Sequence, residues 1–213
     1  MQCFARWHED SERGFCFRDQ TILQFGESWN LLASLVLLNP GSATPQGKPI
    51  TDELWKRGLP YFVEPSEAEH YYEFRLDPLM RNILRAFSEV FPGGAIKIYN
   101  TFNLKNQDSN AALSQVEGIF EHPRFLDVMQ DVRFLSAPVV FGPGQSAEGS
   151  PVLRAQLERY IEQVPLELLY GIQRVGDREF SAERVSPANA LHSYHPSYSC
   201  TRGNKTSFAR IKT

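Results

Sequence analysis

Three polar residues that could do chemistry each stand at a break in an apolar stretch. Asn39 and Asn100 come directly after short apolar runs, and His195 opens the segment His-Pro-Ser-Tyr-Ser. A side-chain amide both donates and accepts hydrogen bonds, so an Asn can orient a water molecule or read the edge of a nucleobase. An imidazole can donate to an oxygen that gains negative charge during bond cleavage. The three residue types fit a site that binds a polar ring and cleaves a bond beside it.

Each of these residues also has a structural explanation. From residue type alone, Asn39 suits a turn, and Asn100 can cap neighbouring backbone. A lone histidine is more often structural than catalytic. The neighbours of His195 favour a functional role, because a proline stiffens the loop and the hydroxyls of Ser197 and Ser199 can contact phosphate oxygens.

The elements that must position these residues follow from the apolar periodicity. Short apolar runs predict strands, and longer stretches with apolar residues three and four apart predict helices. The strands are expected at 15–25, 33–38, 95–99, 139–141 and 166–170, and the helices at about 78–91, 109–120, 123–134 and 150–163. Asp77 and Pro78 mark the start of the first helix, because Asp is a favoured N-cap and Pro suits the first helical position.

Strands alternate with helices from residue 33 to residue 170, which is typical of a parallel sheet covered by helices. We therefore expect an α/β fold, a three-layer α/β/α sandwich with a mainly parallel central sheet. In such a sheet, ligands bind outside the carboxyl ends of the strands. Asn39, Asn100 and His195 are thus predicted to converge on one crevice, beside a long irregular stretch over 42–75.

Size and cysteine content limit the classes to which the chain can belong. A length of 213 residues, 42% of them hydrophobic, suits a single domain over 1–213, and we expect a monomer. No apolar run approaches the roughly 18 residues of a membrane span, and the charged N-terminus does not resemble a secretory signal. Three widely spaced cysteines make neither a disulfide framework nor a metal or iron–sulfur ligand set. We expect no cofactor, no metal and a cytoplasmic location.

Basic residues are concentrated near the C-terminus of a chain whose net charge is −3. From His195 onward there is no acidic residue and there are four basic ones, Arg202, Lys205, Arg210 and Lys212. A local basic strip on an otherwise acidic protein can contact phosphates, which makes DNA a candidate partner. A solvated basic tail is the alternative.

Other motifs carry less weight. Gly142-Pro143-Gly144 lacks the third glycine of a dinucleotide fingerprint. His192 and His195 have no carboxylate or cysteine companion at metal-binding spacing. A Ser–His–Asp triad is not supported either, because the sequence has no Gly-x-Ser-x-Gly elbow.

Four segments, in order, resemble the uracil-DNA glycosylase superfamily over roughly residues 33–205. Residues 39–41 (Asn-Pro-Gly) are similar to the water-activating motif, in the form known from mismatch-specific thymine/uracil glycosylases. Residues 98–101 resemble the strand whose Asn binds the extruded base, and 139–142 resemble the buried strand that ends in an aromatic residue and a glycine. Residues 195–199 are similar to the loop that enters the minor groove.

The resemblance implies the fold and mechanism of this superfamily. The target nucleotide is extruded from the base stack, and cleavage of the N-glycosidic bond leaves negative charge on the base. Asn39 would position the attacking water, Asn100 would read the base edge and His195 would stabilise the developing anion. The remaining assignments are Pro40, Gly41 and Phe62 as substrate contacts, Ser197, Ser199, Arg202 and Lys205 as phosphate contacts, and Tyr198 as the wedge that fills the gap left by extrusion.

The first motif departs from the more active branch of the superfamily, which carries an Asp and a Tyr there. An amide such as Asn39 cannot act as a base. The resemblance therefore implies slower activity, or activity restricted to bases that leave easily. The first strand end also resembles a family of uncharacterised bacterial proteins that have Leu-Asn-Pro-Ser after the strand and a later His-Pro.

Three functions follow as expectations. The first is a DNA glycosylase-like hydrolase that acts on a damaged or deaminated base of the uracil type. The second is a noncatalytic protein of the same fold that binds a nucleobase, a nucleotide or nucleic acid. The third is an interaction protein whose aromatic-rich segment 55–74 docks a partner. Exposed aromatic side chains there would support the third function, and burial would count against it.

Overall fold

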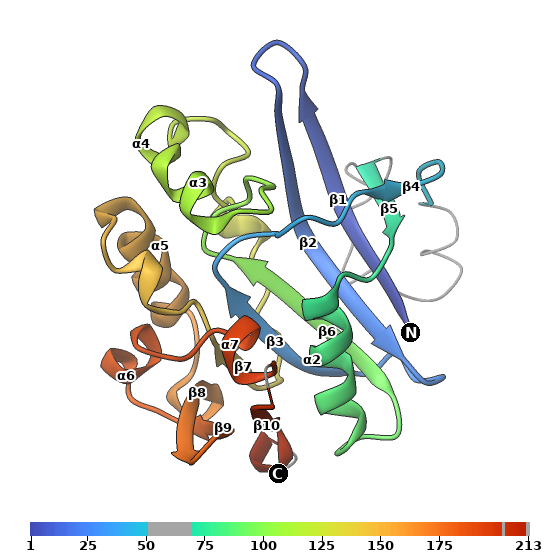
Figure 1. The fold of residues 1–213 in the computed structure, drawn as a ribbon, viewed down its shortest axis with the longest axis vertical. Helices are drawn as coiled ribbons and strands as arrows, with labels where there is room; N and C mark the ends of the chain where they lie inside the picture. Colours follow the sequence, from blue (N-terminus) through green and yellow to red (C-terminus); the bar gives the residue numbers. More distant parts are fainter. Residues whose placement is uncertain (51–69, 202, 212–213) are drawn as a thin grey trace.

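The computed structural model describes residues 1–50, 70–201 and 203–211. The strands of this part form one sheet in the order β10-β9-β8-β7-β3-β6-β2-β1-β5-β4 (Figure 1). They are β1 (Gln2–Asp10), β2 (Phe15–Phe25), β3 (Leu31–Leu37), β4 (Pro45–Gln46), β5 (Tyr71–Phe74), β6 (Gly94–Asn100), β7 (Val139–Phe141), β8 (Leu169–Gly176), β9 (Glu179–Arg184) and β10 (Lys205–Ser207).

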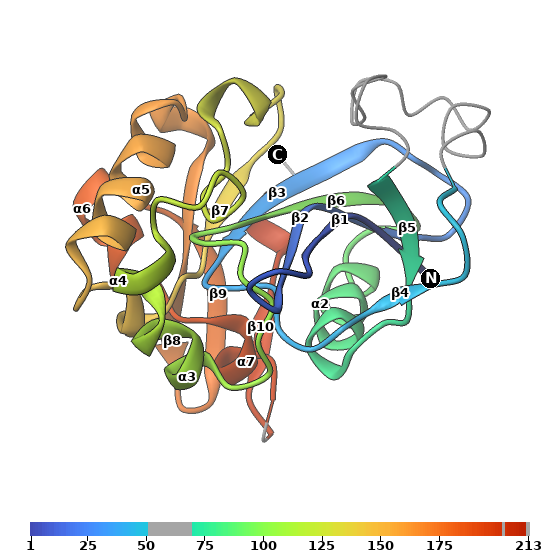
Figure 2. The same ribbon diagram turned by 90° about the horizontal axis from the view of Figure 1, so that it is seen from above.

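The helices of the described residues are short, apart from two. They are α2 (Pro78–Ser88), α3 (Ser109–Ser114), α4 (Val116–Ile119), α5 (Pro151–Glu162), α6 (Pro187–Leu191) and α7 (Pro196–Ser199). Single 3-10 turns follow at η2 (Met129–Asp131), η3 (Gln145–Ala147), η4 (Leu166–Leu168) and η5 (Ala209–Ile211). The two long helices, α2 and α5, lie apart from one another in both views of the fold (Figures 1 and 2).

The sheet is mixed, so the expectation of a three-layer α/β/α sandwich with a mainly parallel sheet is wrong. The strands β6, β3, β7 and β8 are parallel neighbours, and β9 pairs in parallel with β10. The other five of the nine pairings in the described chain are antiparallel. Six α-helices in the same residues are too few for a layer of helices over each face of ten strands.

The N-terminal hairpin is the main source of antiparallel pairing. Strand β2 matches the predicted strand at 15–25, and it joins β1 on one side and β6 on the other. Strand β1 was not predicted, because the charged Arg6 interrupts its apolar residues Cys3, Phe4, Ala5 and Trp7. Arg6 of β1 donates two hydrogen bonds, of 2.6 and 2.7 Å, to the carboxylate of Asp19 on β2. This pair neutralises the charge and lets a charged strand enter the sheet.

The side chains on the two faces of the central strands pack into two separate hydrophobic cores. Side chains alternate along a strand, so Leu35 and Leu37 of β3 lie in one core and Val36 lies in the other. The first core includes Ile83, Leu84 and Phe87 of α2, and the second includes Leu157 and Tyr160 of α5. The long helices thus cover opposite faces of the parallel strands.

Helix α2 begins where the sequence indicated. Asp77 caps it by accepting a 2.8 Å hydrogen bond from the N–H of Met80, and Pro78 occupies the first turn. The strands predicted at 33–38, 95–99 and 139–141 and the helix at 150–163 are also confirmed, within two residues at each end. The strand expected at 166–170 begins only at Leu169, because residues 166–168 form the turn η4.

The helix expected at 123–134 is absent from this described segment, where only the turn η2 forms. The backbone carbonyl of Phe125 accepts a 2.7 Å hydrogen bond from the N–H of Asn103. The buried carboxylate of Asp127 accepts from Asn103 Nδ2 and from the Tyr160 hydroxyl, both at 2.8 Å. These tertiary partners hold the segment out of a helix. The helix expected at 109–120 forms as two pieces, α3 and α4.

Two features are absent from the described residues. No helix there combines the length and the apolar character needed to cross a membrane. No group of three or more His, Cys, Asp or Glu side chains in that part is arranged to hold a metal ion.

Candidate functional site

The carboxyl ends of three parallel strands lie side by side. Strand β3 is in the middle, with Leu37 opposite Asn100 of β6 and Val36 opposite Phe141 of β7. The N–H of Gly142 donates to the carbonyl of Val36 at 2.9 Å, which joins the turn after β7 to β3. The backbone therefore brings the segments that follow β6, β3 and β7 to the same edge of the sheet.

Asn100 is buried at the end of β6. Its Nδ2 donates to the backbone carbonyl of Arg18 at 3.3 Å, where β2 diverges from β6. Its own carbonyl accepts a 3.0 Å hydrogen bond from the hydroxyl of Tyr160. Asn100 is thus fixed in place, and one of its amide hydrogens already serves the neighbouring strand.

Asn39 is also buried, but its side chain is turned toward α3. Nδ2 donates to the carbonyl of Asn106 and Oδ1 accepts from the hydroxyl of Ser109, both at 3.1 Å. Both polar atoms of the amide therefore have protein partners. This arrangement fits the structural explanation of Asn39, and its role in positioning water stays a prediction.

Arg18 reaches the same strand ends, and sequence reasoning missed it. Its Nη2 donates to the carbonyl of Pro40, and its guanidinium carbon lies 5.6 Å from the centre of the Phe74 ring. A Cβ built on Gly41, the next residue, would lie 3.5 Å from Oδ2 of Asp77. The Arg18 guanidinium therefore contacts the turn after β3, and Asp77 lies on the other side of that turn. No local pattern marks Arg18, because it is followed in β2 by the polar residues Asp19, Gln20 and Thr21.

His195 stands at the start of α7, against the turn that follows β7. A Cβ built on Gly144 would lie only 3.1 Å from Cβ of His195, and the N–H of Gly144 donates to the carbonyl of Ser193. His195 Nδ1 accepts from the backbone N–H of Ser197 at 3.1 Å and lies 2.7 Å from its hydroxyl oxygen. Because Nδ1 accepts a hydrogen bond, the ring proton of the neutral imidazole is on Nε2.

The Nε2 atom of His195 is buried and has no hydrogen-bond partner among the described residues. Burial also lowers the pKa of the imidazole from 6.5 to about 4, because the charged form is poorly solvated there. At neutral pH His195 is therefore an uncharged donor whose N–H is unused.

A pocket of about 340 Å³ opens beside His195. Tyr194 and Tyr198 line it, and their rings stack at 6.1 Å with an interplanar angle of 22°. Both rings meet the edge of Phe180 and remain 37% and 50% exposed. An exposed tyrosine pair of this kind offers a stacking surface for a flat ring. Tyr198, the predicted wedge, is therefore accessible.

The predicted phosphate contacts do not gather in one place. Ser197 is exposed beside His195, whereas Ser199 is completely buried and out of reach of a phosphate. Lys205 lines a separate pocket of about 320 Å³ that also contains Glu89, Glu179 and Glu183. Arg210 in that pocket forms a 2.8 Å ion pair with Glu183. The basic strip is thus interleaved with acidic residues from other elements. Arg202 and Phe62 lie outside the described residues.

The aromatic residues of the segment 55–74 fall into two groups. Tyr71 and Phe74 belong to β5 and are buried, Tyr72 is partly buried, and Trp55, Tyr61 and Phe62 lie outside the described part of the chain. Burial of Tyr71 and Phe74 counts against a docking surface built from these rings.

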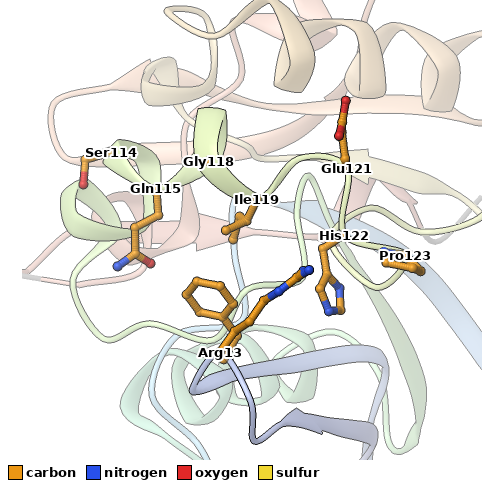
Figure 3. Close-up of a pocket in the computed structure, with 9 residues that line it drawn as sticks. Arg13, Ser114, Gln115, Gly118, Ile119, Glu121, His122 and Pro123 are labelled. Atoms are coloured by element: carbon orange, nitrogen blue, oxygen red, sulfur yellow. The ribbon is translucent and has the colours of Figure 1, made fainter.

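A second cleft, of about 750 Å³, lies between the turn of the β1–β2 hairpin and α3–α4 (Figure 3). Arg13 extends toward His122 in this cleft. His122 Nδ1 accepts from the N–H of Arg124 at 3.1 Å, so Nε2 carries the ring proton and donates to Asp10 at 3.2 Å. Neither ring nitrogen is left to accept a proton from a substrate. The cleft can hold a ligand, but His122 is not placed to act as a base.

Comparisons with protein-family models, curated proteins and solved structures found no match to this chain.

Proposed function

We propose that this protein is a DNA glycosylase-like hydrolase that cleaves the N-glycosidic bond of a damaged or deaminated base of the uracil type. The observation that carries the proposal is the state of His195. It is neutral, its tautomer is fixed by the backbone of Ser197, and its buried Nε2–H has no acceptor in the part of the chain that the structure describes. A buried donor is costly to leave unpaired. Such a group is therefore typical of a site where a bound ligand accepts the hydrogen bond.

A neutral imidazole suits this reaction. As the bond to the sugar breaks, negative charge collects on an oxygen of the departing base, and a fixed N–H stabilises that charge. The lowered pKa of His195 keeps it from entering the site as a cation at neutral pH. Asn100 would read the base edge from the neighbouring strand, and the stacked pair of Tyr194 and Tyr198 would contact the DNA beside the pocket.

The test is cleavage of labelled oligonucleotides under single-turnover conditions. The panel carries uracil, hypoxanthine, xanthine or a G·T or G·U mismatch, and abasic product is revealed by alkaline strand cleavage. We expect product with at least one base. His195→Ala should lower the rate by about 100-fold or more, the effect of removing one donor to a developing oxyanion.

The matched control is His122→Gln, which removes the histidine of the separate cleft in Figure 3. This variant should retain the cleavage rate, with circular dichroism confirming that both variants are folded. Unchanged cleavage by a folded His195→Ala variant would remove the role given to His195.

The alternative function is a protein that binds a nucleobase, a nucleotide or nucleic acid without cleaving it. The engagement of both polar atoms of Asn39 by Asn106 and Ser109 favours this alternative, because no amide atom is then left solely for a water molecule. Fluorescence anisotropy on the same oligonucleotides separates the two. Base-dependent binding by folded protein, with no abasic product from any oligonucleotide, would establish the alternative.

A further inference from the structure

Two arginines are buried in this fold to almost the same extent, and their surroundings differ. Arg6 is 3% exposed and Arg18 is 4% exposed. Arg6 meets the carboxylate of Asp19 through two short hydrogen bonds, and Asp131 approaches it at 3.5 Å. Within the described residues Arg18 forms no ion pair with a carboxylate, and its one hydrogen bond there goes to the carbonyl of Pro40.

Two of the three guanidinium nitrogens of Arg18 are left over. Nε and Nη1 are both buried and have no acceptor within the described residues. The ring of Phe74 contributes only a cation–π contact. Burial lowers the pKa of the guanidinium, opposed by Cys3 and by the carboxylate of Asp77, yet an arginine keeps its proton in proteins. Arg18 is therefore a permanent buried cation with unused donors.

The surrounding groups do not compensate this charge at close range. Asp77 accepts from the N–H of Met80 as the cap of α2, so its carboxylate is held by the helix. The carbonyl of Pro40 supplies a dipole and no net charge. A buried cation that lacks a close counter-charge is expensive, and Arg is the side chain best suited to bind phosphate or carboxylate oxygens.

We propose that Arg18 is the receptor of a buried oxyanion site, in which Nε and Nη1 bind a phosphate or carboxylate oxygen of a ligand at the end of β3. The carbonyl of Pro40, which accepts from Nη2, fixes the guanidinium at this site. The site takes an acidic small molecule or an acidic group of a larger ligand. It does not depend on base cleavage, because its evidence is the unpaired guanidinium and not His195.

The test measures the binding of orthophosphate and of acetate to the protein. Binding is followed by isothermal titration calorimetry and by the change in melting temperature. The reference buffer is chloride at the same ionic strength and pH. We expect one anion to bind with 1:1 stoichiometry and to raise the melting temperature by about 5 °C or more when the anion is about 100-fold above its dissociation constant. The anion that binds with the lower dissociation constant identifies the ligand group as phosphate or carboxylate.

Variants separate this site from general salt effects, because phosphate also stabilises proteins by exclusion from their surface. Arg18→Met should show neither anion binding by calorimetry nor the anion-specific rise in melting temperature. In chloride its melting temperature should be no lower than that of wild type. Arg154→Met, which changes an exposed arginine paired with Glu158 on α5, should keep both responses. Arg18→Lys keeps the charge without the planar fork and should bind at least about 10-fold more weakly.

Three outcomes would contradict the proposed oxyanion site. One is wild-type protein that binds neither anion. A second is an Arg18→Met variant that retains the binding. A third is an Arg18→Met variant that is destabilised in chloride as strongly as Arg6→Met, because Arg18 would then be satisfied within the protein. If Arg18→Met does not fold, the wild-type titration and Arg18→Lys decide the question.

Discussion

A single backbone N–H sets the chemistry of His195. The N–H of Ser197 donates to Nδ1, which fixes the ring proton on Nε2, and burial of the ring keeps it uncharged. Such a histidine offers a donor at neutral pH without acting as an acid. The same geometry makes protonation costly, because a proton on Nδ1 would break the hydrogen bond from Ser197.

Titration of His195 tests this state. Its pKa in the folded protein is about 4, below the ordinary value of 6.5, so the unfolded chain binds more protons between these values. The stability that the neutral ring contributes is present above pH 6.5 and is lost as the pH falls toward 4. We expect wild type to lose stability relative to His195→Gln over that range, as measured by urea unfolding at several pH values. A His195 imidazole signal that titrates near pH 6.5 by NMR would contradict the lowered pKa.

Residue type predicted where some of these side chains lie in the fold, but not how each side chain is oriented. The position of Asn100 at a strand end followed from the apolar run before it, and the structure places it there. The direction of the Asn39 side chain depends on Asn106 and Ser109, 67 and 70 residues away, which no local pattern reveals. Arg18 was hidden for a related reason, since its burial depends on segments distant in the chain.

At the scale of elements, the turn after β7 determines how closely α7 approaches the sheet. Gly144 has φ of +73°, and a side chain there would meet His195 at 3.1 Å. Gly144→Ala should lower the free energy of unfolding by about 1–2 kcal/mol, the cost of a left-handed conformation for a residue with a Cβ. It should also lower cleavage or ligand binding, because His195 must shift.

Gly149→Ala is the control for this prediction, since a Cβ at Gly149 meets nothing within 4 Å. Urea unfolding of both variants gives the comparison, and Gly149→Ala should change stability by less than about 0.5 kcal/mol. Equal stability of the two variants would show that the turn after β7 can relax without cost.

The helices and strands that were predicted correctly are those whose caps and apolar patterns lie within their own residues. Helix α2 has its cap, its proline and its apolar face within one stretch, and β3, β6 and β7 are mostly apolar runs that are buried on both faces. The segment 123–134 has helical spacing, but its backbone and the carboxylate of Asp127 bond to distant partners. Strand β1 depends on Asp19 of the next strand to bury Arg6, so its own residues do not indicate a strand.

At the scale of the molecule, the pair of Arg6 and Asp19 joins the first two strands inside the fold. Asp19→Asn should lower the free energy of unfolding by about 3 kcal/mol or more, because it leaves the buried guanidinium of Arg6 with a weaker partner. The control Asp177→Asn disrupts an exposed ion pair with Arg174 and should change stability little. Guanidinium chloride unfolding of both variants measures the difference, and equal effects would contradict the prediction.

The strands at the two ends of the sheet are short. Strand β4 has two residues and β10 has three, whereas the interior strand β2 has eleven. The outermost strand of a sheet exposes unpaired N–H and C=O groups that can recruit another chain. With only two or three residues at each margin, the ladder offers little template for a neighbouring molecule.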